Sequence, residues 1–278
     1  RQQDADHAVQ CGQGVAYADE GVDLRKNQIN LPIMVMNPSE DSFEILLEHD
    51  LQPEIYSIKI LNYLLRFLHG RSCKIHLKLD TGMHRLGIEE FELEAVIKIL
   101  KANPNLVIAS IFSHLGAADD AASDDFSREQ AKTFLKMAGQ IKHELRVSPL
   151  LHILNSSGIF RFKEFQLDMV RLGIGLYGIN PTVTPDQNLK PVATLKTIIS
   201  QIKKVKAGGT VGYGRKGIAK KDATVATIAI GYADGFSRAF SQGKGIVLIN
   251  GKKAPVLGNV CMDMTMVDMT GIDAKEGD

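Results

Sequence analysis

Hydrophobic residues are spaced in two different ways along this chain, and the spacing changes near Asn180-Pro181. From about residue 15 to residue 180, short runs of apolar and β-branched residues alternate with longer stretches whose apolar residues are spaced three and four apart. That alternation is typical of repeated βα units and a parallel sheet. After residue 180 the helical spacing stops, and the chain predicts strands only.

The first part predicts seven strands, at 14–17, 31–36, 54–58, 74–79, 106–114, 150–155 and 168–175. Helical patterns lie between them at 42–48, 60–69, 89–101 and 127–145. Around the third helix we expect one buried face, made of Ile88, Phe91, Leu93, Val96, Ile97 and Leu100. Because a regular barrel of this class has eight strands, the pattern predicts an α/β fold, a (β/α)8 TIM-like barrel whose first βα unit would precede residue 15.

The second part predicts strands at 194–202, 223–230, 245–249, 255–257 and 264–269, separated by turn signals such as Asn250-Gly251. We therefore expect a partial barrel domain over residues 1–184 and a partial, mostly β domain over residues 185–278. Both ends of the chain are expected to be cut short.

Composition narrows the class of protein. The 278 residues are 44% hydrophobic and 23% charged with a formal net charge of +1, an ordinary globular balance that does not point to nucleic acid. No apolar run approaches the ~18 residues that span a membrane, and the first residues lack a signal-peptide pattern. Cys11, Cys73 and Cys261 are odd in number and in no CxxC spacing, so reduced thiols and a cytoplasmic location are expected.

Polar residues stand at the ends of four consecutive predicted strands, where the active sites of such barrels gather. They are Lys78, Asp80 and Arg85, then His114, then Asn155, Ser156 and Ser157, and last Arg171. Each alone is more often a paired or capping group than a catalyst. Their joint occurrence favours a site, and Ser156 with the backbone of Gly173 and Ile174 fits the phosphate site common after strands seven and eight.

Six motifs, in order and spacing, resemble those of bacterial alanine racemases. They are residues 78–87 (KLDTGMHRLG), Ser113-His114, Asn155-Ser156, residues 171–178 (RLGIGLYG), residues 231–235 (GYADG) and Cys261-Met262-Asp263. The resemblance runs from about Val15 to the last residue. It implies a pyridoxal 5'-phosphate-dependent isomerase that interconverts L-alanine and D-alanine for peptidoglycan, as a homodimer with shared active sites and without a metal.

By this resemblance the cofactor is held mainly from the barrel. Arg171 would contact its pyridine nitrogen, Arg85 would bind its phenolic oxygen, and a carbamylated Lys78 would support Arg85. The phosphate would be held by Ser156, Gly173 and Ile174, with Asn155 nearby.

The resemblance also assigns the bases and the substrate contacts. Tyr232 would be one of the two bases that move the α-proton, with His114 linking it to Arg171. Arg85, Met262 and Asp263 would contact the substrate, and the last two are expected to belong to the neighbouring subunit's site.

One family element is absent from the sequence, the segment that carries the Schiff-base lysine. Lys26 is the first lysine and is expected on a helix, so the missing lysine should lie upstream of residue 15. Two other functions stay open. A metal-dependent barrel hydrolase could use Lys78 and His114, although no His-Xaa-His pair occurs, and a non-catalytic pyridoxal-phosphate-binding protein would not need the β domain. Amino-acid decarboxylases share this domain pairing but not these motifs.

Overall fold

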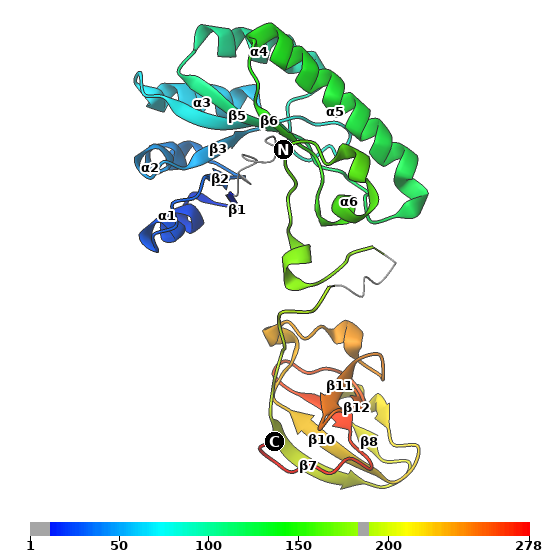
Figure 1. Ribbon diagram of the computed structural model, residues 1–278. Coiled ribbons are helices and arrows are strands. Elements are labelled where there is room, and N and C mark those ends of the chain that lie inside the picture. Colours follow the sequence, from blue (N-terminus) through cyan, green and yellow to red (C-terminus); the bar gives the residue numbers. More distant parts are fainter. Residues whose placement is uncertain (1–11, 183–188) are drawn as a thin grey trace, which may run out of the picture. The chain divides into compact units, whose positions relative to one another are not determined.

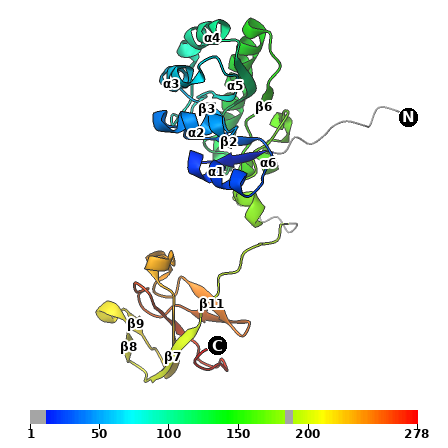
Figure 2. The same cartoon turned by 90° about the vertical axis from the view of Figure 1, so that its left-hand side faces the viewer.

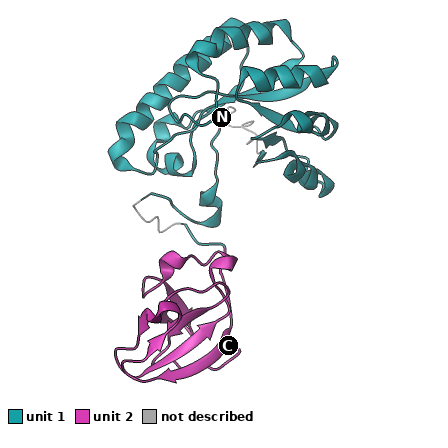
Figure 3. Cartoon of the chain, turned by 180° about the vertical axis from the view of Figure 1, so that it is seen from behind, with its two compact units in different colours: residues 1–192 teal, residues 193–278 magenta. Residues whose placement is uncertain are grey.

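Residues 12–182 and 189–278 are described by the computed structural model, and the chain divides into two units between Val192 and Ala193 (Figure 3). Each unit has its own buried core. The boundary expected after residue 184 falls outside the described residues.

Parallel strands form the sheet of the first unit, in the order in which they follow along the chain (Figure 1). The six strands are β1 (Gln13–Val15), β2 (Ile33–Val35), β3 (Gln52–Ile55), β4 (Cys73–Lys78), β5 (Leu106–Phe112) and β6 (Leu150–His152). Sequential order with parallel neighbours is the topology of a βα barrel, in which each connection is a helix.

Helices of the first unit lie along one side of this sheet (Figures 1 and 2). They are α1 (Ala18–Lys26), α2 (Phe43–Glu48), α3 (Ile58–Leu68), α4 (Leu93–Ala102), α5 (Asp124–Leu145) and α6 (Ser156–Arg161). Shorter 3-10 turns lie at Glu40–Ser42, Glu90–Glu92, Ala121–Ser123, Lys163–Phe165 and Ile174–Tyr177. None of the helices within residues 12–182 and 189–278 is long and apolar enough to cross a membrane.

Helix α3 shows how the local sequence sets these boundaries. The Ser57 side chain accepts a hydrogen bond from the Ile60 backbone N–H, which satisfies one free donor of the first turn. The helix stops at His69, whose φ of 43° is left-handed. Leu61 and Leu64 are fully buried between these ends, so the predicted apolar spacing faces the core.

One member of the predicted helical face is misplaced. Ile88, Leu93, Val96, Ile97 and Leu100 are buried as expected, but the Phe91 side chain is 79% exposed. Phe91 lies in the 3-10 turn Glu90–Glu92 that precedes α4. A 3-10 turn has about three residues per turn, so the α-helical spacing does not extend back to Phe91.

The seventh predicted strand, over residues 168–175, is wrong. Leu151 N–H binds the side chain of Asp168 at 2.8 Å instead of a backbone carbonyl, so no regular ladder forms beside β6. Only two backbone hydrogen bonds follow, from Asp168 to Leu151 and from Arg171 to Leu154. The chain then turns into a 3-10 helix at Ile174–Tyr177.

The second unit is built from antiparallel strands. Three of them, β7 (Ile199–Val205), β10 (Ala223–Ile228) and β13 (Thr265–Asp268), pair in the order β13-β10-β7. Two short pairs complete it, β8 (Thr210–Val211) with β9 (Gly217–Ile218) and β11 (Ile246–Ile249) with β12 (Lys252–Pro255). Its 3-10 turns lie at Tyr213–Arg215, Tyr232–Asp234 and Arg238–Phe240. The mostly β character expected of this part is thus present, with strand ends shifted by a few residues.

Strand register in the first unit brings polar residues together on one face. His76 pairs with Glu54 on one side and with Ser110 on the other. Phe112, two residues after Ser110, pairs with Lys78 and His152. Because alternate residues of a strand point to the same face, these side chains form two adjacent rows inside the sheet.

Candidate active site

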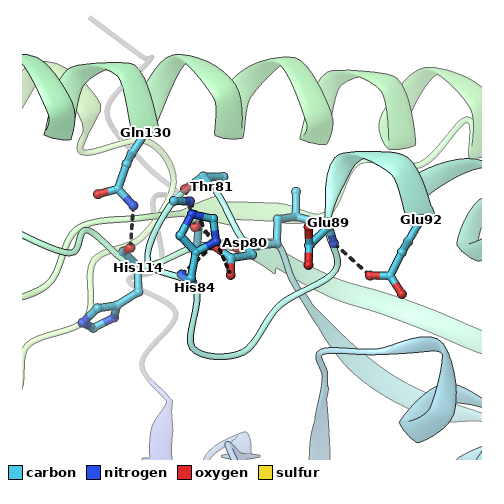
Figure 4. Close-up of polar contacts among 10 residues, drawn as sticks. Asp80, Thr81, His84, Glu89, Glu92, His114 and Gln130 are labelled. Atoms are coloured by element: carbon cyan, nitrogen blue, oxygen red, sulfur yellow. Dashed lines mark hydrogen bonds and ion pairs between the residues drawn. The ribbon is translucent and has the colours of Figure 1, made fainter.

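A closed loop follows β4 and carries the first predicted site residues (Figure 4). The Asp80 carboxylate accepts hydrogen bonds from the backbone N–H groups of Gly82 and His84, at 2.9 and 3.1 Å. The loop returns to its start because Ile88 N–H binds the Lys78 carbonyl at 2.8 Å. Arg85 is exposed in this loop, and its guanidinium makes no hydrogen bond or ion pair among the described residues.

A second set of contacts ties this loop to the end of β5. Ser113 Oγ donates to the Leu79 carbonyl at 2.8 Å, so Thr81 Oγ1 is the donor in its 2.8 Å bond to Ser113. The His114 carbonyl accepts from the Gln130 side chain at 3.3 Å (Figure 4). The ends of β4 and β5 are thereby held against helix α5.

Arg171 is the most heavily hydrogen-bonded side chain of the site. It donates to His152 Nδ1 at 2.6 Å, to His114 Nδ1 at 3.2 Å and to the Ser113 carbonyl at 2.6 Å. Longer bonds reach the carbonyls of His152 and Ile153. The Nε–H of Arg171 has no partner among the described residues, so one donor of the guanidinium remains available to a ligand.

A chain of buried polar side chains continues from Arg171 into the sheet. His152 Nε2 lies 2.9 Å from Ser110 Oγ, and Ser110 Oγ lies 2.7 Å from His76 Nδ1. His76 Nε2 then lies 3.0 Å from Gln52 Oε1. All four of these side chains, those of Gln52, His76, Ser110 and His152, are at most 9% exposed.

The directions of these hydrogen bonds follow from the two ends of the chain, a guanidinium that only donates and the Gln52 amide oxygen that only accepts. A guanidinium only donates, so His152 Nδ1 must be the acceptor and its Nε2 must carry the proton. His152 therefore donates to Ser110, Ser110 donates to His76 Nδ1, and His76 Nε2–H donates to Gln52. Each imidazole is neutral and in a single tautomer.

Electrostatics at the site agree with neutral imidazoles. Burial lowers the pKa of His76 to about 4. Burial, and then the positive charges of Arg171, Arg85 and Lys78, lower the pKa of His114 to about 4. The pKa of His152 lies well below its usual range for the same two reasons, burial first and Arg171 second. Burial also lowers the pKa of Arg171 to about 10, which leaves it charged at neutral pH.

The Phe112 ring contacts both cations of the site, the half-buried Arg171 and the buried Lys78. The Arg171 guanidinium lies 5.1 Å and the Lys78 ammonium 5.6 Å from the centre of its ring. The ring also stacks on His152, with centroids 4.9 Å apart. Lys78 itself donates to Glu54 Oε1 at 2.9 Å.

The residues predicted to hold a phosphate also meet. Ser156 Oγ accepts from the backbone N–H groups of Gly173 and Gly175, at 3.0 and 3.2 Å. Its hydroxyl hydrogen and the N–H of Ile174 have no acceptor among the described residues. Asn155 caps α6 by accepting from Gly158 N–H at 2.9 Å. Unused donors among small residues suit an anion, and this donor set fits a phosphate.

In the second unit, the turn with Tyr232 packs on the segment with Met262. Tyr232 N–H binds the Cys261 carbonyl at 3.0 Å, and Ala233 N–H binds the Met262 carbonyl at 2.9 Å. A Cβ on Gly231 would lie 2.2 Å from the Met262 carbonyl oxygen, so only glycine allows this approach. The side chains of Tyr232 and Met262 are 42% and 55% exposed. Asp263 follows at the same edge and is also exposed.

Comparison with known proteins matches both units. Residues 3–181 match the family described as alanine racemase, N-terminal domain, and residues 192–278 match alanine racemase, C-terminal domain. The chain belongs to the alanine racemase family. The expected fold class, a (β/α)8-type barrel domain followed by a mostly β domain, is confirmed by these matches, and the described residues contain six parallel strands of the barrel sheet.

Curated relatives and solved structures agree. The chain is 37% identical to the alanine racemase of Clostridium kluyveri over 267 residues, covering 93% of this chain and 67% of the relative. It is also 37% identical to that of Halothermothrix orenii, covering 95% of this chain and 71% of the relative. The structure of alanine racemase from a D-cycloserine-producing Streptomyces lavendulae matches 96% of this chain and 72% of its own, with 28% identity and a TM-score of 0.87.

Sequence reasoning found the strand-end residues but missed the polar interior. The structure brings Arg171 to His114 and Ser156 to Gly173, as the motifs predict. Glu54, His76 and Ser110 were not predicted, although polar residues inside apolar strand runs were a signal for them.

Lys26 is exposed on α1 beside Asp23, so it is no substitute for a Schiff-base lysine. No group of three His, Cys, Asp or Glu side chains within residues 12–182 and 189–278 could hold a metal ion.

Proposed function

We propose that this chain is the greater part of an alanine racemase that interconverts L- and D-alanine and supplies D-alanine for peptidoglycan. One observation carries the proposal beyond family membership: Arg171 is held by His152, His114 and Ser113 with its Nε–H left unused. A half-buried arginine held by three partners is a fixed donor that stays charged at neutral pH.

The donor set fits pyridoxal phosphate. Ser156 and the N–H groups around Ile174 would hold its phosphate with Asn155 nearby, Arg171 Nε–H would bind its pyridine nitrogen, and Arg85 its phenolic oxygen. When bound, this cofactor supplies an electron sink that stabilises negative charge at the substrate α-carbon. Arg171 moderates that sink, because a guanidinium does not give up its proton to the ring nitrogen.

The protein's own part in the reaction is to move a proton at the α-carbon. Racemisation needs a base on each face of that carbon, and we assign one face to the Tyr232 phenol and the other to the lysine that the family carries. Because its Nδ1 accepts from Arg171, His114 carries its proton on Nε2, and we assign it the role of linking Arg171 to the tyrosine base. A hydrogen bond to the charged form makes a phenol a better base near neutral pH.

The proposal also covers the substrate contacts, the oligomeric state and the cellular location. We assign Arg85, Met262 and Asp263 to the substrate, with the last two lining the site of the neighbouring subunit of a homodimer. The free thiols of Cys73 and Cys261 support a cytoplasmic enzyme, while Cys11 lies outside the described residues.

Tyr232→Phe tests the proposal in the complete gene product. Racemisation should fall by roughly 10²–10⁴, the contribution of one general base, while pyridoxal phosphate binding stays close to the unmodified level. Exchange of the α-hydrogen with deuterium should fall for one enantiomer of alanine and persist for the other. Tyr213→Phe is the matched control, because Tyr213 is an exposed tyrosine of the same unit. Racemisation by Tyr232→Phe at the rate of Tyr213→Phe would show that Tyr232 is structural.

A further inference from the structure

Gln130 is a buried glutamine of α5 whose side chain binds the backbone of the segment that carries His114 (Figure 4). The residue is 1% exposed. Its amide oxygen accepts from Gly116 N–H at 2.9 Å, and its amide nitrogen donates to the His114 carbonyl at 3.3 Å. A backbone N–H only donates, so the Gly116 contact fixes which end of the amide is the oxygen. Gln130 therefore bridges the two peptide groups on either side of Leu115.

A glutamine is an unusual choice for this face of the helix. Burying an amide costs free energy unless its polar atoms are hydrogen-bonded. Most of the other buried residues of α5 are apolar, namely Ala131, Phe134, Met137, Ala138 and Ile141. An apolar residue would fill the position of Gln130 without that cost, so the amide is explained by its two backbone partners.

His114 is held at two points, its backbone and its ring. The carbonyl accepts from Gln130, and the ring Nδ1 accepts from Arg171 at 3.2 Å. The next residue, Leu115, is 2% exposed, and its carbonyl accepts from the Asn155 side chain at 3.3 Å. Strand β5 ends at Phe112, so these side chains take over from the ladder in holding the backbone that carries the His114 ring.

We propose that Gln130 is a positioning residue of the racemisation site, which holds the backbone of His114 so that the ring keeps its bond to Arg171 and its orientation toward the tyrosine base. The inference rests on the proposed function, from which it takes the link between His114 and Tyr232. Gln130 lies behind the segment after β5 and acts only through His114.

Gln130→Met tests the proposal, because methionine keeps the length of the side chain and removes both hydrogen bonds. The His114 ring is titrated by ¹⁵N spectroscopy in the complete protein with pyridoxal phosphate bound, and its signal is the one lost in His114→Asn. The pKa of His114 is about 4, lowered first by burial and then by the positive charges of Arg171, Arg85 and Lys78. Release of the segment from α5 should expose the ring, so its pKa should rise toward 6.5. This readout needs no turnover.

Kinetics of the same variant test the consequence for the reaction. Racemisation should fall roughly 10–100-fold, as expected when a group of the site is displaced by about 1 Å, while pyridoxal phosphate binding stays close to the unmodified level. Exchange of the α-hydrogen with deuterium should fall for the enantiomer that Tyr232→Phe also slows and persist for the other. Gln140→Met is the matched control, because Gln140 is exposed on the same helix, and it should change neither the pKa of His114 nor the exchange.

An unchanged pKa of His114 in Gln130→Met would overturn the proposal, and so would an equal loss of exchange from both enantiomers. If this variant does not fold, Gln130→Asn keeps an uncharged amide that is about 1.5 Å shorter and cannot reach both backbone partners. An unchanged pKa of His114 in Gln130→Asn would be equally fatal. A protein that racemises no alanine but shows the raised pKa in Gln130→Met would contradict the proposed function while supporting the hold of Gln130 on His114.

Discussion

Ser110 is the central link of the polar chain behind Arg171, and Ser110→Ala removes that link. Ser110 Oγ accepts from His152 Nε2 at 2.9 Å and donates to His76 Nδ1 at 2.7 Å, and the residue is fully buried. Alanine leaves one donor and one acceptor without a partner. Each unpaired buried group costs about 1–3 kcal/mol, so the variant should lose about 2–6 kcal/mol of unfolding free energy.

Ser127→Ala provides a matched control in the same unit. Ser127 is a serine at 1% exposure whose Oγ has no hydrogen-bond partner among the described residues, and it lies within α5. Its replacement removes an unsatisfied hydroxyl and introduces a better helix former, so it should be neutral or stabilise by up to about 1 kcal/mol. Both variants thus remove one buried serine hydroxyl, which has hydrogen-bond partners in Ser110 and has none in Ser127.

Urea unfolding distinguishes the two variants. The circular dichroism of helices reports on the first unit, because the described α-helices all lie there, and the chain has no tryptophan that would serve instead. The midpoint should fall for Ser110→Ala and not for Ser127→Ala, with similar slopes. Equal stabilities of the two variants would refute the hydrogen-bond chain.

Two further predictions concern protonation and backbone. The pKa of His76 is lowered to about 4, so its contribution to the free energy of unfolding is complete above the unfolded pKa of 6.5 and should be lost as the pH falls through about 4. ¹⁵N spectra should show a neutral His76 ring at pH 5. A titration midpoint of the His76 ring near 6.5 would contradict this prediction. Gly87→Ala should destabilise by more than about 3 kcal/mol, since φ is +147° and the new Cβ would lie 2.4 Å from Asp80 N. Gly70→Ala, at a φ of +80° with open space around it, should cost only about 1–2 kcal/mol in the same unfolding assay.

Much of the architecture could be predicted because it rests on local periodicity. The helical patterns and six of the seven barrel strands reflect which residues are buried, and burial alternates with a regular period. The strand predicted over residues 168–175 was wrong for a reason that the sequence pattern does not contain. The Asp168 side chain, and not a backbone carbonyl, accepts the hydrogen bond from Leu151 N–H. The predicted burial of Phe91 was wrong for a related reason, because the 3-10 turn before α4 has fewer residues per turn than an α-helix.

The polar interior could not be predicted from the sequence, because it depends on register between strands. His76 and Ser110 stand 34 positions apart and become neighbours only when β4 and β5 pair with the irregularity that falls between Ile75 and His76. One residue of slip would turn each of these side chains to the opposite face. Residues at strand ends can be predicted without knowing the register, because all parallel strands of a barrel end on the same rim. The motifs therefore predict which polar groups stand at this rim, whereas the role of Ser110, which binds His152 behind Arg171, follows only from the paired sheet.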